Sequence, residues 1–133
     1  MTQELREKLA PHSHVPVEKI KFRYYWADYV LDRSNLAIVF LYDDNEQSRQ
    51  AFDLLTKVIS GIQSSKLTLF VTDYYFEFLE TYQTFSDLPD LDQNPIQVVW
   101  FDNRNPVSHL QLSDLDENNI RDNTLHLISQ SDK

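Results

Sequence analysis

The sequence predicts an α/β fold in which helices flank a central mixed sheet. Two continuous apolar runs, 36–42 and 67–72, have the length and side-chain branching of buried strands. Between them, residues 45–62 place apolar side chains at three- and four-residue steps, which indicates a helix. Two strands joined by a helix normally lie parallel. A third apolar run, 96–101, leads through a turn at 102–106 into a further strand, which predicts an antiparallel hairpin.

Ahead of these elements, the chain predicts a short helix and an extended linker. Leu5 and Leu9 lie four residues apart among charged residues, which favours an amphipathic helix over 1–10. Pro11 ends this helix, and Pro11 and Pro16 together restrict the following backbone to extended conformations. The sequence leaves open whether the helix docks on the rest of the chain or frays.

The remaining elements follow from local patterns. Apolar and charged residues alternate over 20–26, as in a half-buried strand. Residues 28–33 predict a short helix or turn, and 76–85 predict a helix with several aromatic residues. Residues 87–95 lack periodicity and contain two prolines, which predicts a loop. A final helix is expected over about 116–128, with Asp116 or a neighbouring residue as its cap.

Residues that are typical of helix ends lie at both ends of the long helix at 45–62. Asp43 and Asp44 precede its first turn, where we expect their carboxylates to cap free N–H groups and complement the helix dipole. Gly61, the only glycine in the chain, lies near the other end. A left-handed residue is often required there, which glycine adopts readily.

Composition limits the classes of partner. At 133 residues and 41% hydrophobic content, the chain suits one core, so we divide it into a helix and linker at 1–19 and a single domain at 20–133. The formal net charge of −9 repels nucleic-acid phosphates and anionic membranes and favours a neutral or basic protein partner. A protein that mimics nucleic acid is the one alternative consistent with such acidity.

Targeting signals are not evident in the sequence. No apolar run reaches the length needed to span a bilayer, and Glu4 and Glu7 interrupt the region where a signal peptide needs an apolar segment. We therefore expect a cytoplasmic protein.

Taken together, the element order resembles the thioredoxin-like fold over roughly 20–128. Thioredoxin-like proteins place a cis-proline directly before the penultimate strand, and Asn94 and Pro95 stand directly before 96–101. The resemblance therefore implies a cis peptide bond at Pro95, which is a minority state for such bonds in general. A flavodoxin-like sheet would share part of this order, but the terminal hairpin and the lack of a glycine-rich loop fit it less well.

The family's redox motif would open the long helix, near Asn45–Ser48. Asn45 and Ser48 stand where the paired cysteines are expected, and the chain contains no cysteine at all. Because thiolates are the nucleophiles of disulfide exchange, the sequence excludes that activity.

The resemblance also implies a place for binding, since thioredoxin-like proteins hold extended peptides beside the motif through backbone hydrogen bonds. Exposed aromatic residues are favoured interface anchors, so the aromatic segment after 67–72 is a second candidate. The candidate partner-binding residues are Tyr42, Asp44, Asn45, Glu46, Gln47, Ser48, Asn94, Pro95, Tyr74 and Tyr75.

Cation binding, catalysis and metal binding are less well supported interpretations of the polar residues. The carboxylates of 43–46 could bind a cation or act as a base, although helix capping and solvation account for them. Ser48 has no histidine near it in sequence, and a serine without a base is unreactive. His12 and His14 supply only two ligands of an incomplete metal site. We predict no catalytic residue, metal or cofactor.

The leading hypothesis is a non-catalytic, thioredoxin-like protein-binding module, such as an adaptor, a chaperone-like protein or an assembly factor. One alternative is a small-ligand-binding protein or thiol-independent enzyme that uses the Asp43–Ser48 cluster. A further alternative is a structural subunit that forms a homodimer through a strand edge or an aromatic patch.

Overall fold

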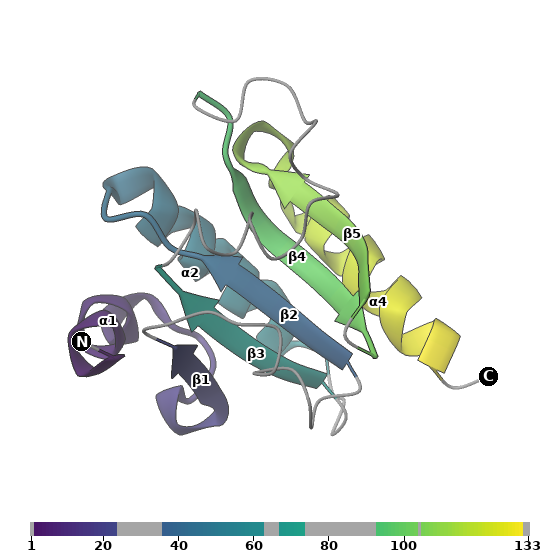
Figure 1. The fold of residues 1–133 in the computed structure, drawn as a ribbon, viewed down its shortest axis with the longest axis horizontal. Helices are drawn as coiled ribbons and strands as arrows, with labels where there is room; N and C mark the ends of the chain where they lie inside the picture. Colours follow the sequence, from purple (N-terminus) through teal and green to yellow (C-terminus); the bar gives the residue numbers. More distant parts are fainter. Residues whose placement is uncertain (1, 24–35, 63–66, 74–92, 104, 132–133) are drawn as a thin grey trace.

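A sheet of five strands organises the chain in the computed structural model, which describes residues 2–23, 36–62, 67–73, 93–103 and 105–131 (Figure 1). The strands are β1 (Ile20–Arg23), β2 (Leu36–Leu41), β3 (Leu67–Thr72), β4 (Ile96–Asp102) and β5 (Asn105–Gln111). The described α-helices are α1 (Thr2–Leu9), α2 (Glu46–Ser60) and α4 (Glu117–Ser131). Short 3-10 helices span Ala10–His12, Val17–Lys19 and Leu112–Asp114.

The strand order across the sheet is β1-β3-β2-β4-β5. β3 pairs parallel with both β1 and β2, whereas β4 pairs antiparallel with β2 and with β5. Ile38 of β2 therefore lies between Leu69 of β3 and Trp100 of β4. This arrangement confirms the predicted mixed sheet, the parallel pair joined by α2 and the terminal hairpin.

The central strand, β2, is buried along its whole length because both faces of the sheet are covered. One face carries Leu36, Ile38 and Phe40, which join the core cluster with apolar residues of α2 and α4. Figure 1 shows α2 and α4 behind this face. The opposite face carries Ala37 and Val39, which are also buried. The continuous apolar run in the sequence is thus the pattern of a strand covered on both faces.

The N-terminal helix α1 is docked. Leu5 is 3% exposed and Leu9 is fully buried, and both belong to the core cluster. The guanidinium of Arg6 lies over the ring of Phe22 in β1, 5.4 Å from its centroid, as in a cation–π contact. These contacts decide the question that the sequence left open, whereas the division of the chain at residue 19 stays a prediction.

Two expectations about the ends of α2 are wrong. The N-cap is Asn45, whose side-chain oxygen accepts the Ser48 N–H at 2.8 Å, so neither Asp43 nor Asp44 caps the helix. Gly61 is right-handed, with φ −87°, because its N–H closes a helical-type turn onto the Val58 carbonyl at 3.1 Å. In contrast, Asp116 accepts the Asn119 N–H at 2.7 Å, which confirms the expected cap of the final helix.

The expectation of a cis peptide bond at Pro95 is also wrong, since the described residues contain no cis peptide bond. The trans bond is the lower-energy isomer. Hydrogen bonds hold the loop instead, because the Pro95 carbonyl accepts the Leu112 N–H at 2.8 Å. The elements expected at 28–33 and 76–85, the end of the first strand at 24–26 and most of the loop at 87–95 lie outside the described residues.

Within the described ranges, none of the helices has the length and hydropathy required to cross a membrane.

A buried hydrogen bond joins α4 to the sheet and gives the first testable prediction. Trp100 Nε1 donates to Thr124 Oγ1 at 3.0 Å, and the Thr124 hydroxyl donates to the Ile120 carbonyl at 2.8 Å. Thr124→Val keeps the side-chain shape but leaves the indole N–H buried without an acceptor. We expect this to lower the free energy of unfolding by about 1–3 kcal/mol, measured by chemical denaturation. Leu125→Ala, on the exposed side of α4, is the control. Equal stability of the Thr124→Val protein and wild type would contradict the prediction.

Candidate functional site

The segment between β2 and α2 forms the first wall of the candidate site. β2 ends at Leu41, and α2 begins at Glu46. Residues 43–45 connect these elements and 46–47 begin α2, and all five are exposed. We call residues 43–47 the docking surface. The structure therefore places Asp44, Asn45, Glu46 and Gln47 at the surface, and their role in partner binding stays a prediction.

Ser48 is buried. The residue is 1% exposed, and its Oγ accepts the Asp43 N–H at 3.0 Å and donates to Gln97 Oε1 at 3.3 Å. Gln97 lies where the pairing of β4 with β5 shifts register, between Ile96 and Val98. The Ser48 hydroxyl thus joins the start of α2 to the start of β4 and has no free path to a partner or substrate.

Tyr42 is also buried, with 4% of the residue exposed. Its hydroxyl donates to Asp44 Oδ1 at 2.9 Å. Arg49 Nη1 lies 3.4 Å from both the Tyr42 hydroxyl and Asp44 Oδ1. Burial raises the pKa of Tyr42, so its hydroxyl stays protonated and remains a donor to Asp44. The tyrosine therefore fixes the orientation of an exposed carboxylate rather than presenting its own ring.

Asn94 holds the loop before β4. Its Nδ2 donates to Ser113 Oγ at 2.8 Å, and its Oδ1 accepts the Ser113 N–H at 2.7 Å. Gln111 Nε2 donates to the Asn94 carbonyl at 2.8 Å. The Asn94 side chain is thus committed to the segment that follows β5, and Pro95 beside it is half-buried.

The structure brings together two of the predicted segments and leaves a third undescribed. The Ser48 contact with Gln97 makes the start of α2 a neighbour of the strand that follows Asn94 and Pro95. Tyr74 and Tyr75 lie outside the described residues.

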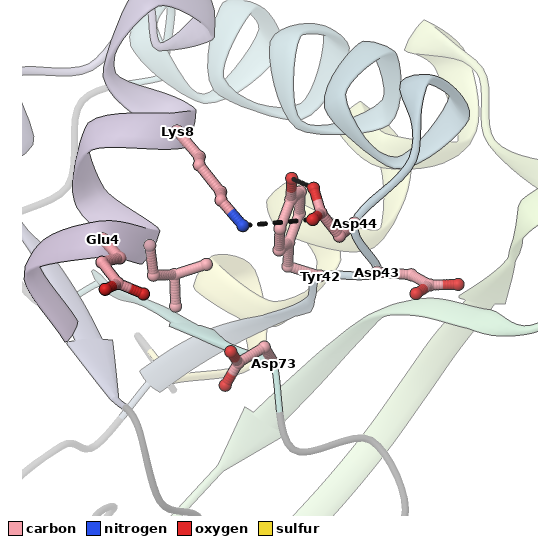
Figure 2. Close-up of a pocket in the computed structure, with 7 residues that line it drawn as sticks. Glu4, Lys8, Tyr42, Asp43, Asp44 and Asp73 are labelled. Carbon is pink, nitrogen blue, oxygen red and sulfur yellow. Dashed lines mark hydrogen bonds and ion pairs between the residues drawn. The ribbon is translucent and has the colours of Figure 1, made fainter. Parts of the chain in front are cut away.

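Next to the docking surface lies a cavity of about 320 Å³ that the sequence did not predict (Figure 2). One wall comes from α1 and the other from the segments that follow β2 and β3. We call this cavity the Lys8 hollow. Its lining residues are Glu4, Leu5, Lys8, Tyr42, Asp43, Asp44 and Asp73. The apolar spacing of Leu5 and Leu9 signalled that a helix could dock, but no sequence signal indicated where.

The Lys8 side chain enters this hollow from α1, and its ammonium points toward Asp44 (Figure 2). Lys8 Nζ donates to Asp44 Oδ2 at 3.1 Å, across 36 positions of sequence. This hydrogen bond is the main cause that lowers the pKa of Asp44, with a further contribution from the Tyr42 hydroxyl. The same contact raises the pKa of Lys8. Burial raises the pKa of Asp73, because its carboxylate has lost part of its water.

Of the two histidines considered as metal ligands, His14 contacts a carboxylate of α2. His14 Nε2 lies 2.9 Å from Asp53 Oδ1, on α2. Among the residues that the structure describes, no group of three or more His, Cys, Asp and Glu side chains is placed to hold a metal ion. His109 lies in β5, where burial lowers the pKa of its imidazole.

The Lys8–Asp44 pair gives a prediction about pH. Because the pKa of Asp44 is lowered on folding, its stabilisation is present above the unfolded-state pKa and is lost as the pH falls through the folded-state pKa. The raised pKa of Lys8 means that its contribution is lost as the pH rises through the folded-state value.

Lys8→Met removes the ammonium and should therefore raise the pKa of Asp44 toward its usual value, measured by carboxyl-carbon NMR titration. Lys57→Met removes an exposed lysine that pairs instead with Glu117, at 3.6 Å, and should leave the Asp44 titration unchanged. An unchanged Asp44 titration in the Lys8→Met protein would show that the ion pair does not form in solution.

Comparison with known proteins yields a distant structural likeness. Neither the known protein families nor the curated proteins give a match. Among solved structures, the chain is similar to a mutant thioredoxin from Halobacterium salinarum NRC-1, with 15% sequence identity and a TM-score of 0.49. The match covers 79% of this chain and 87% of that chain. By the order of its elements and the pairing of its strands, the chain has a thioredoxin-like fold, and it contains no cysteine.

Proposed function

We propose that this chain is a non-catalytic binding module that takes a neutral or basic segment of another protein at its docking surface. The observation that carries the proposal is a contrast at one edge of the sheet. Residues 43–47 are exposed, whereas the hydroxyl of Ser48 and the side-chain amide of Asn94 are used in internal hydrogen bonds. This edge therefore exposes charged and polar side chains, whereas the Ser48 hydroxyl is already hydrogen-bonded.

Backbone geometry supports binding of an extended segment. Asn45 satisfies the N–H of Ser48, and the Arg49 N–H begins the helical ladder by donating to the Asn45 carbonyl at 3.2 Å. The N–H groups of Glu46 and Gln47 precede this ladder and have no partner within the helix. They are placed to donate to the carbonyl groups of a peptide that lies across the start of α2.

Charge supports a basic partner. The docking surface carries Asp43, Asp44 and Glu46 on a chain with a formal net charge of −9. A field of this sign speeds the encounter with a basic segment and disfavours acidic ones.

The alternative of a thiol-independent enzyme has less support. Ser48 donates its hydroxyl proton to Gln97, and an amide oxygen cannot act as the general base that would activate the serine. The carboxylate of Asp43 accepts a hydrogen bond from Asn45 Nδ2 at 3.1 Å, which turns it toward the loop rather than toward Ser48.

Charge reversal at the start of α2 tests the proposal. Tagged protein is used to capture partners from a native lysate of the source cells, and the partner identified by mass spectrometry is then purified for calorimetry. Glu46→Lys should weaken binding by about tenfold or more, because it replaces an attractive charge at the interface with a repulsive one. Asn45 and Asn94 are unsuitable for this test, because their side chains hold the local structure.

The matched control is Glu117→Lys. Glu117 is the first residue of α4 as Glu46 is of α2, so the two variants change the net charge and the first helical turn in the same way. The control should bind the partner nearly as wild type does. If the two variants bind the partner equally well, the partner does not contact the docking surface and the proposal is wrong.

A further inference from the structure

We propose that the Lys8 hollow receives the ammonium group of a lysine side chain from the partner protein, and that Lys8 occupies this position in the free chain. The inference rests on the proposed function, since it names the chemistry by which the same edge recognises its partner. It also means that α1 supplies a side chain, Lys8, that competes with the partner lysine for the same site.

The hollow already holds an ammonium group. Lys8 Nζ lies 3.1 Å from Asp44 Oδ2, although the two residues belong to elements distant in sequence. The Tyr42 hydroxyl binds the other oxygen, Oδ1, at 2.9 Å, which leaves Oδ2 directed at the incoming cation. The acceptor is thus positioned by a buried residue and does not depend on Lys8 for its orientation.

The lining suits a lysine side chain. Three carboxylates, those of Glu4, Asp44 and Asp73, surround one ammonium group, so a cation remains favoured when Lys8 leaves. Leu5 and Tyr42 provide apolar surface for the methylene stem. Figure 2 shows the Glu4 carboxylate across the Lys8 ammonium from Asp44 and the Asp73 carboxylate below the ammonium, whereas the Asp43 carboxylate points away. The volume of about 320 Å³ leaves room for a side chain beside the residues that line it.

Lys8 can leave without undocking α1. The side chains of Lys8 and Asp44 are 49% and 62% exposed, and exposed ion pairs are weak. In contrast, Leu5 and Leu9 are buried in the core and hold the helix in place. A partner lysine cannot bind while Lys8 fills the site. Its apparent affinity is therefore the intrinsic affinity multiplied by the fraction of molecules whose site is empty. Displacement of Lys8 by a partner lysine would therefore cost little free energy.

The test uses a three-lysine peptide, acetylated at its N-terminus and amidated at its C-terminus, titrated into labelled protein and followed by amide NMR shifts. The wild-type spectrum should change at Tyr42, Asp44 and Asp73. Lys8→Met should bind the peptide about two- to fivefold more tightly, because it empties the hollow. Lys8→Gln, which is polar but uncharged, should give a similar increase.

Lys57→Met is the control variant. It also removes one positive charge from an exposed lysine in an ion pair, so it reproduces the change in net charge without touching the hollow. Its affinity for the peptide should stay close to that of wild type. The same peptide with acetylated lysine side chains should not bind any of the proteins.

Three outcomes overturn the inference. The first is that either Lys8 variant gains no more affinity than Lys57→Met. The second is that the amide NMR shifts change at residues other than Tyr42, Asp44 and Asp73. The third is that spermidine displaces the peptide at concentrations below those the peptide itself requires, which would make the hollow a polyamine site.

The failure of this inference is distinguishable from the failure of the proposed function. If Glu46→Lys abolishes partner binding while the Lys8 variants bind the peptide no better than Lys57→Met, partner binding at the docking surface is supported and lysine binding in the hollow is refuted. If the Lys8 variants gain affinity for the peptide while partner binding is insensitive to Glu46→Lys, lysine binding in the hollow is supported and partner binding at the docking surface is refuted.

Discussion

The structure depends on one joint, where the chain turns from β2 into α2. Asn45 caps the helix through the Ser48 N–H, and the Ser48 hydroxyl spans the Asp43 N–H and Gln97 Oε1. This buried serine ties the start of α2 both to the segment that follows β2 and to β4. A substitution that removed the hydroxyl would leave the amide of a buried glutamine without this partner, which is costly in a core.

The same joint explains how a thioredoxin-like fold can exist without thiols. At the start of α2, the positions that the family resemblance assigns to cysteines hold a cap and an interior hydrogen-bond donor, so their roles here are structural. Residues 43–47 are left exposed, and their side chains have no thiol chemistry. Asp44 links this surface to α1 through Lys8, so the two proposed binding sites, the docking surface and the Lys8 hollow, share one carboxylate.

Local sequence patterns predicted the elements whose burial is continuous. The apolar runs predicted β2, β3 and β4 within a residue, because strands covered on both faces are mostly apolar along their length. The cap of α2 was assigned to Asp43 and Asp44 because carboxylates and Asn45 cap equally well, and the choice depends on where the chain leaves the strand. No local pattern could pair Lys8 with Asp44, since that contact requires the docking position of α1. The bonds from Asn94 to Ser113 likewise depend on the hairpin between them.

The central claim is that a partner protein lies across the start of α2, and site-specific photo-crosslinking tests it most directly. A photoreactive amino acid replaces Gln47, the second residue of α2, in one protein and Asn118, the second residue of α4, in another; both positions are exposed. The account predicts that the captured partner crosslinks at position 47 and not at 118. Crosslinking at 118 alone, or equal yields at both positions, would contradict it.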